Sequence, residues 1–147
     1  MLKDTFPRKL SGALALAVID ARTGQVISTF VRRNLIVATG YAAAAQALAG
    51  VAGAAITAVR VGTSTSPPAT TDTAITNAVQ VPVVSVEYPD SAVQFNFQIN
   101  ANTANGLNIA EWGLITADGR LFSRMVRDEI IAKTDAIEIL GNWTINL

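Results

Sequence analysis

The chain has 147 residues, half of them hydrophobic and only 15% charged, with eleven basic residues offset by eleven acidic ones. A net charge of zero gives no long-range field that would attract nucleic acid or an anionic membrane surface. The sequence contains neither cysteine nor histidine, which excludes disulfides, thiol nucleophiles, thiolate zinc, Ser-His-Asp triads and imidazole metal sites.

Two apolar runs near the N-terminus predict a β-hairpin. Residues 13–19 are apolar on both faces, which is typical of a strand covered on two sides, and residues 25–31 alternate. Between them, residues 20–24 have turn chemistry, with Gly24 suited to a positive φ. The basic residues before the first run give it a superficial likeness to a signal peptide, but the run is short and a strand explains it better.

An uncharged, alanine-rich segment follows, from Asn34 to Val59. It is long enough to span a bilayer, but a spanning helix would be richer in leucine, isoleucine, valine and phenylalanine, so we expect no membrane association. Instead we expect a helix through residues 41–49, with Thr39 as its N-cap and Gly50 just after its end. Its small side chains predict close packing against a sheet face.

A polar loop follows a strand expected at residues 56–61. Residues 62–73 offer no large apolar side chain to bury and include Pro67-Pro68, so we expect this loop to be peripheral to the core and available to a partner. Asp72 is expected to cap a single helical turn that runs to Asn77.

The second half of the chain predicts five further strands, at residues 83–88, 93–100, 109–116, 121–126 and 137–147. The clearest is 93–100, where Phe95 and Phe97 share a parity with Val93 and Ile99 while amide side chains take the other face. We expect these aromatics and Trp143 to belong to one buried core.

The expected fold is mainly β, with about eight strands and one convincing helix. We predict a single domain over residues 1–147, namely an antiparallel β-sandwich or jelly-roll-like domain with one inserted alanine-rich helix.

The acidic residues give little support for catalysis. Glu87 and Glu111 are the only two acids well inside expected strands, and a glycoside-cleaving pair would need them to face each other across a cleft. Asp118-Gly119 is read as a hairpin turn rather than a calcium loop, and Asp128-Glu129 is placed in a loop. We therefore expect no enzyme, and no catalytic, cofactor-binding or metal-binding residues.

The basic and aromatic residues are interpreted in the same way. The doublets Arg8-Lys9 and Arg32-Arg33 lack the aromatic interleaving of a nucleic-acid patch, so they are expected to be solvated strand ends or links between subunits. Trp112 and Trp143 are expected in the core or at an interface.

No side chain titrates at its reference pKa between about pH 5.5 and 7.5, so we expect assembly and stability to change little with pH in this range.

Low charge and amide-rich strand faces suit a subunit packed among neighbours, because obligate interfaces are depleted in charge at their centre. We expect a homo-oligomer, with a trimer as the first possibility, and no nucleic-acid or membrane partner.

Several segments, in their order along the chain, resemble small structural virion proteins of tailed bacteriophages, in particular the group associated with tails, fibres and baseplates. The similar segments cover most of the chain from about Gly12 onward and include residues 21–26, 34–37 with Gly40, 61–65, 67–69, 72–75, 111–115, 118–119, 121–124, 133–134 and 143–145.

This resemblance implies a non-enzymatic virion component that assembles with itself and a larger scaffold, in a tail, collar or fibre-attachment position. Two alternatives remain open at this point. One is a capsid decoration (cement) protein, and the other is a carbohydrate-binding module that recognises the host surface.

Overall fold

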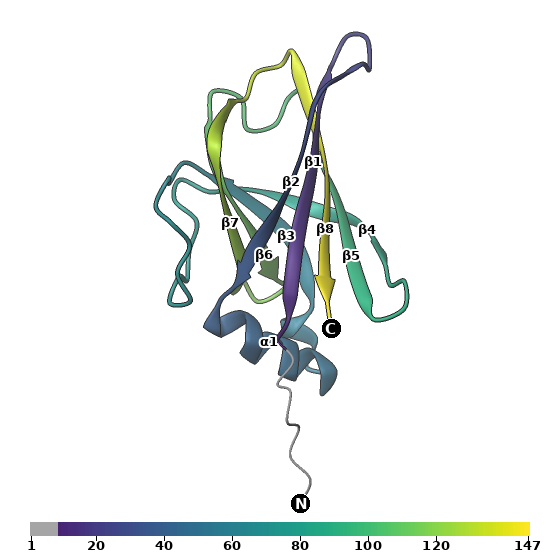
Figure 1. Ribbon diagram of the computed structural model, residues 1–147, viewed down its shortest axis with the longest axis vertical. Helices are drawn as coiled ribbons and strands as arrows, with labels where there is room; N and C mark the ends of the chain where they lie inside the picture. Colours follow the sequence, from purple (N-terminus) through teal and green to yellow (C-terminus); the bar gives the residue numbers. More distant parts are fainter. Residues whose placement is uncertain (1–8) are drawn as a thin grey trace, which may run out of the picture.

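The computed structural model describes residues 9–147, in which eight antiparallel strands form a closed barrel with a helix at one end (Figure 1). Around the barrel the strands follow the order β1-β2-β7-β6-β3-β4-β5-β8. The elements are β1 (Ser11–Asp20), β2 (Val26–Ile36), α1 (Ala38–Leu48), the short 3-10 helix η1 (Ala52–Ala54), β3 (Ile56–Gly62), β4 (Val79–Glu87), β5 (Ala92–Ile99), β6 (Asn108–Thr116), β7 (Leu121–Ala132) and β8 (Ile137–Asn146).

The barrel corrects the prediction of a β-sandwich or jelly-roll. All eight strands were expected, but β2 and β7 continue beyond their predicted ends at residues 31 and 126, and β4 begins before residue 83.

Closure depends on β2 and β4, each of which changes neighbour along its length. β2 pairs with β1 from Val26 to Asn34 and with β7 only at Leu35 and Ile36. β4 pairs with β3 through Val79–Pro82 and with β5 through Val83–Glu87. Strand alternation looks the same in a sandwich and in a barrel, so the sequence pattern alone could not distinguish them.

The barrel interior is filled by alternating side chains from every strand. Trp112 and Trp143 are fully buried, and Phe95 and Phe97 are 8% and 2% exposed. All four belong to one continuous apolar cluster, which confirms the predicted core.

The outer face of β1 is less covered than expected. Leu14, Leu16 and Val18 point into the barrel, whereas Ala13, Ala15 and Ala17 are half-buried on its outside. The apolar run therefore reflects small residues on an outer face and not a strand covered on both sides.

The helix α1 packs on β7, as its small side chains predict. Gly40 lies so close to the strand that an added Cβ would overlap the carbonyl oxygen of Phe122. The N-cap is Val37 and makes no side-chain cap hydrogen bond. Thr39, the expected cap, instead donates its hydroxyl to the carbonyl oxygen of Leu121 at 2.6 Å, which ties the first turn to β7.

Three smaller expectations also need correction or qualification. Asp72 caps no helical turn, because the segment up to Asn77 consists of turns and extended chain. Asp128-Glu129 lies within β7 and not in a loop. Arg8 is outside the described residues. Among the described residues, no helix is long and apolar enough to cross a membrane.

Candidate functional site

The structure does not bring the two candidate carboxylates together. Glu111 is 1% exposed on β6 and faces Arg124 of β7, whereas Glu87 lies near the exposed end of β4 and accepts a hydrogen bond from Asn96 of β5. β6 and β4 are not neighbours in the barrel. The geometry therefore gives no support to the pair as a catalytic acid and base.

Glu111 is the centre of a buried ionic cluster that sequence analysis missed. The Nε of Arg124 donates to its Oε2 at 2.8 Å, and Nη1 of the same arginine donates to Oδ2 of Asp72 at 3.0 Å. Arg124 is only 4% exposed. Because each charge has a partner with good geometry, the cluster compensates for part of its desolvation.

The cluster also fastens the loop between β3 and β4 to the barrel. Oε1 of Glu111 accepts the backbone N–H groups of Ser64 and Thr76 at 3.1 and 2.6 Å, and Thr70 accepts the N–H of Ala38 at the start of α1. Most of residues 65–71 are exposed, as predicted for a peripheral loop, but the prediction missed the buried polar contacts near both of its ends. The availability of the loop to a partner stays a prediction. The loop lacks apolar anchors, but buried polar contacts hold it.

Lys133 is a second buried charge, with 1% of its surface exposed. Its Nζ donates to Oδ1 of Asn105 and to the carbonyl oxygen of Thr134, both at 2.8 Å. These contacts join the end of β7 to the loop that precedes β6. Burial lowers the pKa of Lys133 below its usual value, against the opposing charges of Asp135 and Glu138.

The lowered pKa of Lys133 predicts a stability change at alkaline pH. The unfolded chain holds this proton up to about pH 10.5, whereas the folded chain releases it earlier, so stability should rise as pH increases through the folded pKa. We expect the free energy of unfolding of the wild type to increase with pH relative to that of Lys133→Met. Urea denaturation at steps from pH 7 to 10.5 measures this difference.

The exposed Lys9→Met variant serves as the control for the loss of one positive charge. A constant difference between wild type and Lys133→Met across the whole series would contradict the proposed proton release.

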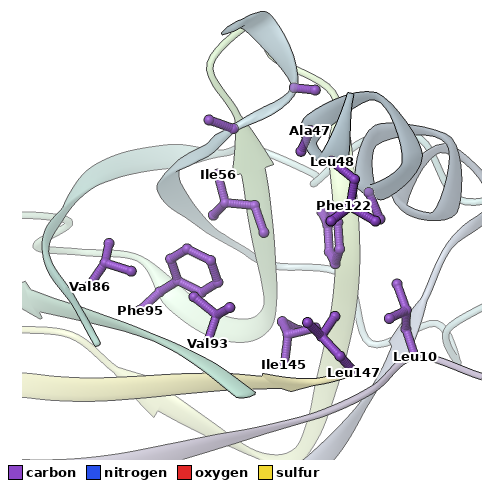
Figure 2. Close-up of a pocket in the computed structure, with 13 residues that line it drawn as sticks. Leu10, Ala47, Leu48, Ile56, Val86, Val93, Phe95, Phe122, Ile145 and Leu147 are labelled. Carbon is purple, nitrogen blue, oxygen red and sulfur yellow. The ribbon is translucent and has the colours of Figure 1, made fainter. Parts of the chain in front are cut away.

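An apolar groove opens at the end of the barrel that carries α1 (Figure 2). It has a volume of about 450 Å³ and lies where β4 has left β3, so that helix and hairpin side chains form its walls. Its lining residues are Leu10, Ala44, Ala47, Leu48, Ala54, Ala55, Ile56, Val86, Val93, Phe95, Phe122, Ile145 and Leu147. Leu48, Val86 and Leu147 at its rim are exposed. Apolar surface of this kind commonly marks a contact with another molecule.

A second opening separates β2 from β7. The two strands share backbone pairs only at Leu35 and Ile36, and side chains bridge the rest of the gap. The guanidinium of Arg127 stacks 4.5 Å from the ring centroid of Phe30, and Arg32 pairs with Asp128 at 3.3 Å. Arg32 is therefore linked within its own chain, whereas the sequence suggested a solvated end or a link between subunits.

The outer surface of β2, β1, β8 and β5 is uncharged over most of its width. Strand register places nine uncharged side chains on one face, which we call the outer sheet face: Ala13, Ala15, Ala17, Thr29, Val31, Asn96, Leu140, Asn142 and Thr144. Charged residues lie at its margins, including Arg33 on β2, Glu138 on β8 and Glu87 on β4. This surface combines small side chains with amides and has the low charge of a subunit contact.

Within residues 9–147 the aromatic side chains do not form an exposed platform. Both tryptophans are buried, and the exposed Tyr41 and Tyr88 lie on α1 and after β4. No group of three or more potential metal-ligating side chains occurs within residues 9–147. Comparisons of the chain with family models, with curated proteins and with solved structures found no match.

Proposed function

We propose that this chain is a non-enzymatic structural subunit of a tailed-bacteriophage particle, and that it assembles with copies of itself and with a larger scaffold. The observation that carries the assembly role is the uncharged outer sheet face. A surface with so few charges costs less to desolvate than a charged one, and its alanines allow a neighbour to approach closely.

The apolar groove gives the same role independent support. It is built from a helix, a hairpin and both ends of the described chain, so its shape is fixed by the fold. The assignment to a phage particle depends on the ordered motifs described above, and among positions on the particle we favour the tail, the collar or a fibre attachment.

Gold-labelled antibodies on purified particles test this assignment. Particles would be collected from lysates in which the gene is expressed, and particles made with a stop codon in the gene serve as the matched control. We expect label on the tail or collar, and peptides of the chain in the mass spectrum of the particles. Label spread over the capsid shell would instead favour a decoration protein. If the chain is present in the lysate but absent from the purified particles, the proposal is contradicted.

A further inference from the structure

One edge of β2 is unpaired along most of its length. From Val26 to Asn34 the strand pairs with β1 on one side, and within residues 9–147 no strand pairs with it on the other. Figure 1 shows β2 diverging from β7 in this region. A long free edge presents backbone N–H and C=O groups that readily accept another strand.

The side chains on this edge favour such pairing. Ile27 and Val31 are 58% and 72% exposed, and Thr29 between them is also exposed. Thr29 and Val31 share the outer side of the strand, whereas Ile27 is the extra residue of a bulge. All three are β-branched, which suits the pleated surface of a sheet. Natural proteins commonly place charged residues or proline on an edge that must stay unpaired. Residues 26–31 contain neither, and the two charges of the edge, Arg32 and Arg33, lie at its end near β7.

We infer that the free edge of β2 is the contact between two copies of this chain, paired antiparallel about a two-fold axis at Thr29. This inference rests on the proposed assembly role and adds the β2 edge as a contact between copies, beside the outer sheet face. In this register Thr29 of one copy lies opposite Thr29 of the other, and Val31 of each copy lies on the same face two residues further along the strand.

The charges of β2 fit the same register. The only charged residues on the strand are Arg32 and Arg33. They lie opposite Val26 and Gln25 of the second copy, so no two like charges face each other directly. The pairing extends the outer sheet face of one copy into that of the next, because Thr29 and Val31 belong to that face in each.

A single cysteine tests the register, since the natural chain has none. Two Thr29→Cys chains place identical residues directly opposite each other, at a Cα separation that a disulfide accepts. We expect mild oxidation to convert most of this variant to a covalent dimer. Asn102→Cys is the control. Asn102 is exposed in the loop between β5 and β6, outside the β2 edge, the outer sheet face and the apolar groove, and this variant should cross-link much less.

The association itself is measured by sedimentation equilibrium. We expect a dimer for the wild type. For Val31→Lys we expect a dissociation constant at least about tenfold higher, because the symmetric contact loses this side chain twice. Val31 is 72% exposed, so the thermal midpoint of the isolated Val31→Lys chain should stay close to that of the wild type.

A monomeric wild type at 100 micromolar concentration, a trimer, or equal cross-linking of the two cysteine variants would overturn the β2 contact. Those results leave the particle assignment standing, because gold labelling decides it separately. Conversely, a β2 dimer from a chain that is absent from particles would retain the contact and refute the virion role.

Discussion

Replacing Arg124 with methionine is expected to lower the free energy of unfolding by about 3–5 kcal/mol, since it leaves a buried carboxylate without its counter-charge. Glu111 is 1% exposed, so solvent cannot easily replace the guanidinium. Urea denaturation at neutral pH measures the loss. Methionine has a similar length to the aliphatic part of arginine, so the effect reports the missing charge more than a missing volume.

A double variant separates the ion pair from the backbone contacts. Glu111→Gln combined with Arg124→Met removes both charges but keeps a side-chain oxygen that can accept the N–H groups of Ser64 and Thr76. We expect this double variant to be more stable than Arg124→Met alone. A double variant that is less stable than the single one would contradict our account of an uncompensated charge.

An exposed pair provides the scale for comparison. Arg32 and Asp128 are 41% and 89% exposed, so Arg32→Met should change the free energy of unfolding by about 0–1 kcal/mol. If Arg124→Met has an effect no larger than this, the cluster is not important for stability.

The strands could be predicted because their alternation is imposed by burial. Residues 93–99 show this alternation best, because successive side chains of a strand point in turn into the barrel interior and to its outside. The closure of the barrel could not be predicted, because burial alternation carries no information about it. It depends on where β2 and β4 change neighbours, and a strand that changes partners keeps the same alternation of side chains.

The helix was placed correctly but its first residues were misread. Thr39 has the chemistry of an N-cap, yet its hydroxyl has a tertiary partner in Leu121. Gly40 carries the informative signal, because only a residue without Cβ lets the helix approach Phe122 this closely. Sequence analysis can note such a glycine but cannot name the strand that it faces.

The ionic cluster and the proposed contact were missed because their parts are far apart in the sequence. Asp72, Glu111 and Arg124 come from a loop and two strands, and nothing in their spacing links them. One signal was available. Glu111 and Arg124 lie on adjacent strands of a hairpin, with a parity opposite to that of the core residues Trp112 and Met125, and opposite charges on one face of a hairpin can pair across it. The free edge of β2 could not be foreseen, since it exists only because β7 turns away.

Removing the ring of Phe97 is expected to have an effect of the same size as the loss of Arg124. Phe97 is 2% exposed, with its ring centroid 6.3 Å from that of Trp112. Phe97→Ala should cost about 3–5 kcal/mol, a large part of a typical stability of about 5–15 kcal/mol. Leu140→Ala is the control, because this side chain is 41% exposed on the outside of β8 and its loss should cost about 1 kcal/mol.

The position opposite Phe97 gives the sharper test, because Gly141 of β8 is its direct cross-strand partner. A Cβ at Gly141 would overlap the Phe97 ring, so Gly141→Ala alone should destabilise the wild type by about 1–3 kcal/mol through overpacking. Once Phe97→Ala has removed the ring, the same alanine fills part of the cavity and should be neutral or stabilising. Thermal and urea denaturation of the two single variants and the double variant measure this coupling. Additive losses would mean that the ring of Phe97 does not lie over Gly141, and the packing described for the barrel interior would be wrong.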